Sequence, residues 1–176
     1  MSVKDSVKWL KKAAEQEHVD AQFQMVAVFE KGICAKKSMV EAARWCRKAA
    51  EQGHAQAQLY MAALHTQGRG VPKNDVEIVR WCKLAAEQGK VEAQSSLGDF
   101  YLNGSGGLTP NNKEAARWYR KAADQGSPIA QCKLGRLYFE GLGVAESDAE
   151  SKRWVKKAAD QGNSEAQHLM QVLSWC

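Results

Sequence analysis

Apolar and small residues return in the same order about every 36 residues along the chain. Tryptophan marks this period, with intervals of 36, 36, 37 and 36 residues between Trp9, Trp45, Trp81, Trp118 and Trp154. An alanine pair follows each tryptophan four residues later, and a second series keeps the same steps: Ala21-Gln22, Ala57-Gln58, Ala93-Gln94, Ala130-Gln131 and Ala166-Gln167. Such self-similarity indicates one supersecondary unit used about five times. The single interval of 37 predicts one inserted residue near Gly107, in a loop.

Each period contains two stretches with helical spacing of apolar residues. In the second copy, Ala57, Met61 and Leu64 lie three or four residues apart, which predicts a helix over about residues 57–67 that ends at Gly68. Equivalent glycines end this helix, which we call the A helix, in the other copies: Gly32, Gly104 and Gly141. Glycine is favoured there because it adopts the left-handed conformation without a steric penalty.

The second helix of each period, the B helix, carries the tryptophan. Asn74 is followed three residues later by Glu77, which is the pattern of a capping box at a helix N-terminus. The same pattern occurs at Ser38 and Glu41, Asn111 and Glu114, and Ser147 and Glu150, with a weaker version at Ser2 and Asp5. Glycines at 53, 89, 126 and 162 end the B helices, but Glu17 stands at the first such position and predicts a looser stop. The five register tryptophans, each beside an alanine pair, are predicted to be core residues.

The order of these elements predicts an all-α chain of about ten helices in a single domain, residues 1–176. It begins with a B half-repeat over residues 1–17 and continues with repeats over residues 18–53, 54–89, 90–126 and 127–162. An A half-repeat over residues 163–176 ends it. Because one helix pair cannot bury its apolar stripe alone, stacked neighbours are expected to share a continuous core.

The fourth copy resembles the Sel1-like repeat, a relative of the tetratricopeptide repeat. The resemblance rests on Ala130-Gln131, Leu134-Gly135, Tyr138, Gly141-Leu142-Gly143-Val144, Trp154, Ala158-Ala159 and Gln161-Gly162, and its register extends over the whole chain. It implies a right-handed α/α superhelical solenoid of antiparallel helix pairs, with A helices lining a concave face and B helices a convex face. Members of the family generally act as adaptors that assemble other proteins.

Several positions depart from the family pattern. Cys46 and Cys82 stand where copies usually have a tyrosine after the tryptophan, as in Trp118-Tyr119. Val26 and Ala62 replace the helix-packing glycine that is kept at Gly98 and Gly135, and His65 is predicted to be a substituted core aromatic. Cys34 replaces the second glycine of the turn between the A and B helices.

The resemblance places the partner-binding positions on the concave A-helix face. These positions differ from copy to copy, which fits a surface adapted to one partner, although neutral drift would also vary them. The predicted set is Asp20, Phe23, Glu30, Gln56, Leu59, Gln67, Glu92, Asp99, Leu102, Asn103, Arg136, Phe139 and Glu140, and Cys132, Glu165 and His168 continue the same register. Excess acids with apolar anchors predict a basic, amphipathic protein or peptide partner.

Basic residues gather instead on the B helices. One row precedes the tryptophans and a second follows them by two places: Lys8, Arg44, Arg80, Arg117 and Arg153, then Lys11, Arg47, Lys83, Arg120 and Lys156. Regularly spaced positive charge could bind nucleic acid or an anionic surface. Glutamates three or four residues earlier instead favour ordinary intrahelical ion pairs. Trp175, at the other end of the chain, is open to two interpretations: self-association or a folded-back cap.

Composition adds mainly exclusions. The net charge of +5 is modest, and the chain shows neither a membrane-length apolar run nor a secretory leader, so a cytoplasmic protein is expected. Five cysteines without paired or metal-ligand spacing predict reduced thiols. No catalytic, cofactor or metal motif is found, so no such site is predicted. A cysteine-rich branch of the family is associated with penicillin binding and β-lactamase activity, but that branch carries paired cysteines, which this chain lacks.

Overall fold

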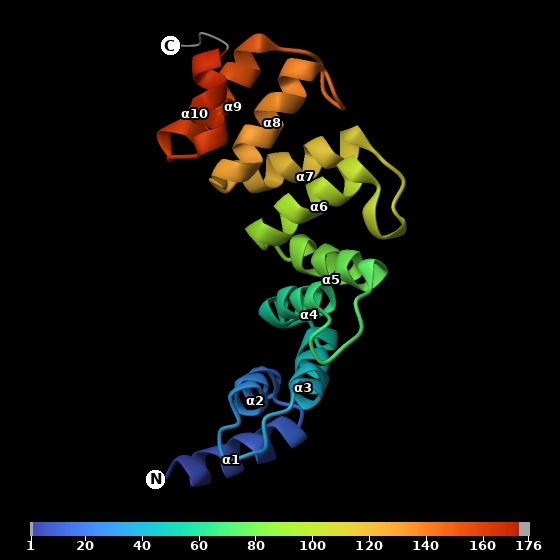
Figure 1. Cartoon of the computed structure of the whole chain (residues 1–176), viewed down its shortest axis with the longest axis vertical. Helices are drawn as coiled ribbons and strands as arrows, with labels where there is room; N and C mark the ends of the chain where they lie inside the picture. Colours follow the sequence, from blue (N-terminus) through green and yellow to red (C-terminus); the bar gives the residue numbers. More distant parts are fainter. Residues whose placement is uncertain (1, 173–176) are drawn as a thin grey trace. The chain divides into compact units, whose positions relative to one another are not determined.

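The computed structural model describes residues 2–172, which contain ten α-helices, no strand and one short 3-10 helix (Figure 1). The B helices are α1 (Val3–Glu15), α3 (Met39–Glu51), α5 (Asp75–Glu87), α7 (Asn112–Asp124) and α9 (Asp148–Asp160). The A helices are α2 (Val19–Lys31), α4 (Ala55–Gln67), α6 (Val91–Asn103), α8 (Pro128–Glu140) and α10 (Ser164–Val172). The predicted all-helical fold is confirmed. The 3-10 helix, Ser105–Gly107, lies in the loop where the extra residue was predicted.

The helices form two compact units, Met1–Gln88 with α1 to α5 and Gly89–Cys176 with α6 to α10. Within each unit, every helix packs against the next helix in the chain. The organisation of the ten helices as a single domain stays a prediction.

The core of each unit is built from the register tryptophans and the alanine pairs. Trp45, Trp81, Trp118 and Trp154 are buried as predicted, whereas the prediction is wrong for Trp9, whose side chain is 61% exposed. Trp154 packs among residues of the two preceding helices, α7 and α8. Among residues 2–172, α1 is the first helix, and Trp9 has no equivalent of the two helices that pack around Trp154.

A ladder of buried glutamines joins successive repeats. The carboxamides of Gln22, Gln58 and Gln131 donate to backbone carbonyls of the preceding B helix, at 3.1–3.3 Å. Each also accepts a hydrogen bond, at 2.8 Å, from the glutamine at the C-terminal end of the following B helix: Gln52, Gln88 and Gln161. Buried polar groups are costly unless paired, so this arrangement satisfies them while joining three consecutive helices.

Helix capping agrees with the sequence in part. Ser38, Asn74, Asn111 and Ser147 each accept from the backbone N–H three residues on, as predicted. A full reciprocal box is observed at Ser2 and Asp5, which was predicted to be the weaker version. At the other four helices the glutamate carboxylate pairs with an arginine three residues further along: Arg44, Arg80, Arg117 and Arg153. The arginine competes for the carboxylate there.

Two turns hold a side chain in a conformation that favours glycine. Glu17 has a φ of 66° and Cys34 a φ of 54°, close to the left-handed values that glycines adopt at these register positions. The helix before Glu17 ends at Glu15, with Gln16 as its cap, as the other B helices end. The first B helix therefore ends at the same register position as the other B helices. The energetic cost of this end is the left-handed backbone conformation of Glu17.

We predict that Glu17→Gly raises the free energy of unfolding by roughly 1 kcal/mol, because a left-handed residue with a Cβ is strained by about this amount. The matched reverse change, Gly53→Glu, places a side chain at the same position one repeat later, where a Cβ would meet no atom within 4 Å. It should lower stability by a similar amount. Urea unfolding followed by circular dichroism measures both. Shifts of the same sign would contradict the assignment.

Candidate partner-binding surface

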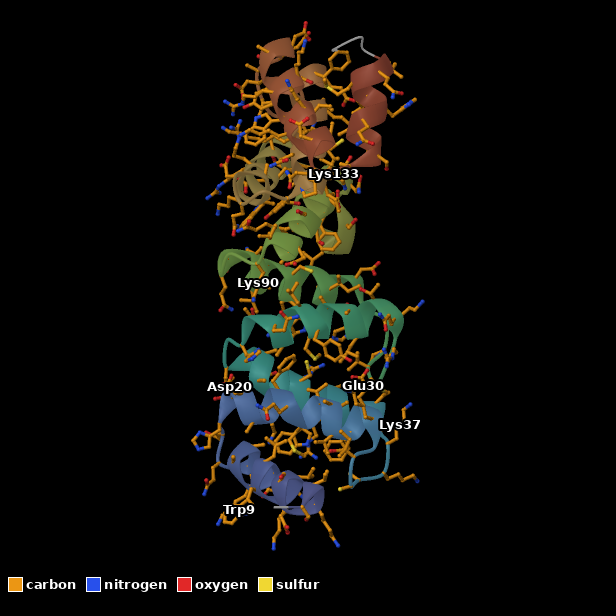
Figure 2. The ribbon with its side chains drawn as sticks, turned by 90° about the vertical axis from the view of Figure 1, so that its left-hand side faces the viewer. Trp9, Asp20, Glu30, Lys37, Lys90 and Lys133 are labelled. Atoms are coloured by element: carbon orange, nitrogen blue, oxygen red, sulfur yellow. The ribbon has the colours of Figure 1, made fainter. Side chains whose placement is uncertain are left out.

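The thirteen predicted partner-binding residues all lie on A helices, and none of them is buried. They are divided between α2 and α4 in the first unit and α6 and α8 in the second, and we call each half the A-helix face of its unit. Figure 2 shows Asp20 and Glu30 toward opposite ends of α2. Cys132, predicted to share this face, is instead buried at 1% exposure and packs with Val155 and Ala158.

In the first unit, an aromatic cluster forms the centre of the A-helix face. The Phe23 ring lies 4.5 Å from the His54 ring and 6.4 Å from the Tyr60 ring, measured between centroids. The Tyr60 hydroxyl donates to Glu30 at 2.7 Å, and Arg69 pairs with the same carboxylate at 2.9 Å. Burial and the Glu30 carboxylate raise the pKa of Tyr60 to about 12. Phe23 and Glu30 are thus held by residues of the next repeat.

In the second unit, Asp99 stands at the centre of a polar cluster. It accepts a hydrogen bond from the Tyr119 hydroxyl at 2.5 Å and pairs with Lys133, whose ammonium lies over the Tyr119 ring. Burial, then the hydrogen bond to Asp99, raises the pKa of Tyr119 above its ordinary range. A hollow of about 220 Å³ beside this cluster is also bounded by Leu102 and Arg136.

A second hollow, of about 320 Å³, lies between α8, α9 and α10. Its rim carries Arg136, which pairs with Glu165 at 3.0 Å and with Glu140 at 3.8 Å. The 43% exposed Phe139 also lines it. The remaining lining residues are Ser151, Val155, His168 and Leu169.

The acidic character predicted for the face is reduced by cations that the sequence did not place there. Arg69 and Lys133 neutralise Glu30 and Asp99. Arg69 lies in the turn after α4, and Lys133 lies on α8 at a position that was not assigned to the face, so the count of assigned positions did not include them. The resulting face combines apolar side chains with charge pairs.

The arginines of the row that precedes the tryptophans form the predicted intrahelical ion pairs. Arg44, Arg80, Arg117 and Arg153 lie 3.1–3.7 Å from the glutamate three residues earlier. Exposed pairs of this kind add little stability. In the second row, the Arg120 guanidinium lies 5.0 Å from the centre of the Trp154 ring, which belongs to the next B helix.

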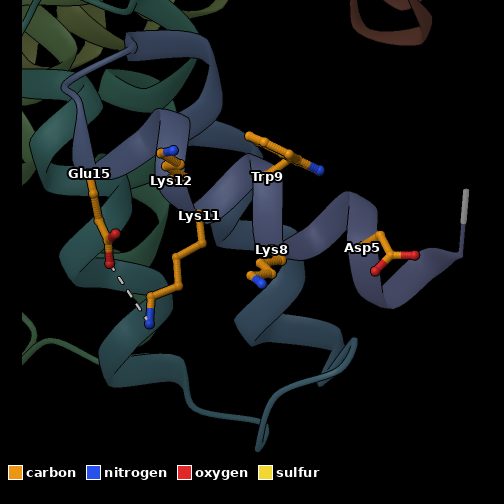
Figure 3. Close-up of a pocket in the computed structure, with 6 residues that line it drawn as sticks. All are labelled: Asp5, Lys8, Trp9, Lys11, Lys12 and Glu15. Carbon is orange, nitrogen blue, oxygen red and sulfur yellow. Dashed lines mark ion pairs between the residues drawn. The ribbon is translucent and has the colours of Figure 1, made fainter.

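A depression of about 490 Å³ surrounds Trp9 on α1 (Figure 3). Lys12 lies over the Trp9 ring at 5.4 Å, and Lys11 pairs with Glu15 at 3.8 Å. All six lining residues come from α1, so the depression is a stretch of helix surface rather than an enclosed site.

Over residues 2–172, no cluster of three histidine, cysteine or acidic residues could hold a metal ion, and no helix is long and apolar enough to cross a membrane. His65 is buried, as predicted for a substituted core aromatic, and its Nδ1 lies 3.0 Å from the Pro72 carbonyl oxygen. Cys34 is exposed, whereas Cys46 and Cys82 are buried core thiols. Trp175 lies outside the described residues.

Fold and surface together define a helical repeat protein with a variable A-helix face. The Sel1 repeat matches residues 4–18, 19–54, 55–90, 91–127 and 128–163, and the chain belongs to this family. Sel1 repeat proteins generally act as scaffolds for protein–protein interaction. No curated protein matches the sequence.

Three solved bacterial structures illustrate the similarity. The protective antigen c5321 of uropathogenic Escherichia coli, which displays an SLR fold, is 36% identical with a TM-score of 0.84, over 97% of this chain and 36% of its own. A Sel1 repeat protein from Oxalobacter formigenes is 33% identical with a TM-score of 0.84, over 98% and 50%. Cysteine rich protein B of Helicobacter pylori, at 23% identity and a TM-score of 0.58 over 76% and 95%, shares the fold. The chain thus spans one third to one half of the first two relatives.

We predict that all five cysteines are titratable thiols and that, among the four in the described residues, Cys34 reacts first. Burial raises the pKa of Cys46 to about 12 and those of Cys82 and Cys132 to about 11, so at pH 8 these thiols are both shielded and protonated. Ellman's reagent should therefore modify Cys34 in the native, unreduced protein at least about tenfold faster than these three. After denaturation all five should react. Three or fewer thiols in the denatured monomer would contradict the prediction.

Proposed function

We propose that this chain is a non-catalytic scaffold that binds a protein or peptide along its A-helix faces. The proposal rests on one observation: within each repeat, the residues that pack the core differ from the residues that vary at the surface. Packing positions repeat and are buried, whereas the thirteen variable positions remain at the surface and, in the second unit, several of them border two hollows. Concave sites lined by apolar groups and a few polar groups are the usual form of binding sites.

The partner surface that fits best is apolar with basic residues at its edges. Leu102 and Phe139 offer apolar contact, and central contacts of this kind supply most of the affinity in protein interfaces. The Asp20 carboxylate, 89% exposed, and that of Glu92 are accessible to a partner's cation. Glu30 and Asp99 already have cationic partners within the chain, so charge would contribute mainly to orientation and association rate.

Neither alternative function has an observation in its favour. The arginines of the row that precedes the tryptophans are paired with glutamates, which removes part of the positive potential that nucleic acid would need. The paired cysteines that accompany penicillin binding in one branch of the family are absent from this sequence.

We predict that Leu102→Ala together with Phe139→Ala lowers the amount of partner captured from a lysate by at least about tenfold, because the variant loses two central apolar contacts. Capture by the purified chain, identified and quantified by mass spectrometry, measures the change. Helicity and melting temperature should stay near those of the unmodified chain, since both residues lie partly exposed.

The matched control reverses charge on the B helices with Lys83→Glu and Lys156→Glu. Both side chains are exposed, and capture should persist at the unmodified level. Arg120 is unsuitable for this control because it stacks on Trp154. Loss of capture in the control variant and its retention in the A-helix variant would refute the proposal.

A further inference from the structure

One pair of positions sets how closely an A helix and the following B helix pack. Gly98 on α6 faces Tyr119 on α7, and a Cβ built on Gly98 would lie 2.5 Å from the phenol ring. Tyr119 fills this space completely and is fully buried. Tyr119 can take this position only because residue 98 has no side chain, and its ring occupies the space that a side chain at Gly98 would need.

In the other repeats too, a larger residue at one of these two positions accompanies a smaller residue at the other, with one exception. At the same register positions in the first unit, the larger Val26 and Ala62 accompany the small Cys46 and Cys82. In the last pair, Gly135 on α8 is kept, and a Cβ there would lie 2.6 Å from Val155 on α9. Valine has no ring, so this is the pair in which a glycine is not matched by a tyrosine.

The 320 Å³ hollow described above opens at this pair, with Val155 in its wall. It lies at the register of the 220 Å³ hollow beside Tyr119, where Arg136, Phe139 and Val155 replace Asp99, Leu102 and Tyr119. The helices that form it, α8, α9 and α10, follow one another within the second unit (Figure 1). The site is thus the equivalent, one repeat later, of the hollow that Tyr119 lines, with the smaller Val155 in its wall.

The inner wall of this hollow carries a polar group that has no partner. Ser151 is 1% exposed, and among the described residues its Oγ makes no hydrogen bond. Ala115 holds the same register position one repeat earlier, so the hydroxyl is not a requirement of the packing. Buried hydroxyls are normally paired, and an unpaired one that lines a hollow indicates a ligand with a polar tip.

The rim of the hollow is polar and exposed. Arg136, Glu140 and Glu165 form ion pairs there, each with about half of its side chain accessible. A peptide backbone crossing the rim would meet both donors and acceptors, while the interior accepts an apolar group.

We propose that this hollow binds a tyrosine side chain of the partner, with the ring against Val155 and Leu169 and the hydroxyl bonded to the Ser151 Oγ. A tyrosine that enters from the surface arrives with its hydroxyl foremost, so the polar tip reaches the buried serine. This inference rests on the proposed scaffold function and specifies one chemical feature of the partner.

The test uses the full chain and N-acetyl-tyrosine amide as the probe, followed by methyl NMR. The Val155 and Leu169 methyl signals should shift saturably, with a dissociation constant on the order of 1 mM for a ligand of this size. N-acetyl-phenylalanine amide should bind at least about threefold more weakly, because it cannot satisfy the serine. In Ser151→Ala the two probes should bind equally. This variant should fold, since alanine is native at the equivalent position.

Val155→Tyr should narrow the hollow from within and weaken probe binding, because the equivalent hollow beside Tyr119 is smaller, about 220 Å³ against about 320 Å³. Lys156→Tyr, which adds a tyrosine at the neighbouring exposed position of α9, is the matched control and should leave probe binding unchanged. Undiminished binding to Val155→Tyr, or equal binding of N-acetyl-leucine amide, would overturn the proposal. So would a shift of the same methyl signals by Trp175→Ala alone, because the chain's own C-terminus would then be the occupant.

The outcomes separate this inference from the scaffold function. If the probe fails to bind while partner capture still depends on Leu102 and Phe139, only the tyrosine site is wrong. If the probe binds as expected but no protein is captured through the A-helix face, the scaffold function is wrong and the hollow is a site for a small phenolic ligand.

Discussion

The buried carboxamide of the A-helix glutamine is the interaction on which the repeat architecture depends. It donates to a backbone carbonyl of the preceding B helix and accepts from the glutamine that ends the following B helix. One side chain therefore fixes three helices in a core that otherwise consists of alanine, tryptophan and small aliphatic residues. Alanine pairs let the helices approach closely enough for these bonds to form, and nearest-neighbour coupling of this kind makes such repeats stable only in series.

Residues whose contacts lie within one period could be read from the sequence. Helix caps, left-handed glycines and core tryptophans recur because each repeat has to begin, end and pack the same two helices. The fold was predicted from this recurrence. Trp9 shows where this reasoning ends. Its sequence surroundings match those of the buried tryptophans, but burial depends on the helix pair that comes before it, which repetition alone does not supply.

The candidate site was less predictable because its contacts join residues that do not recur. Asp99 pairs with Lys133, 34 residues later in the sequence, and Glu30 pairs with Arg69, 39 residues later. In the described residues, neither ion pair recurs at the equivalent positions of another repeat. Helix register predicted surface exposure at the thirteen positions, which follows from helix geometry, but it was wrong for Cys132, which is buried. The charge of the face did not follow, because it depends on which long side chains reach across from neighbouring elements.

Packing compensation links the fold to the proposed site. The sequence showed cysteines in place of tyrosine and larger residues in place of glycine as separate departures, whereas the structure shows that Gly98 and Tyr119 occupy facing positions. A change on one helix is thus tolerated when the other helix changes in the opposite sense. Val155 takes the place of Tyr119 against Gly135, and a hollow lies beside it at the edge of the core, on a face that already varies. Variation at such positions can create a binding site while the glutamine ladder and tryptophan core stay intact.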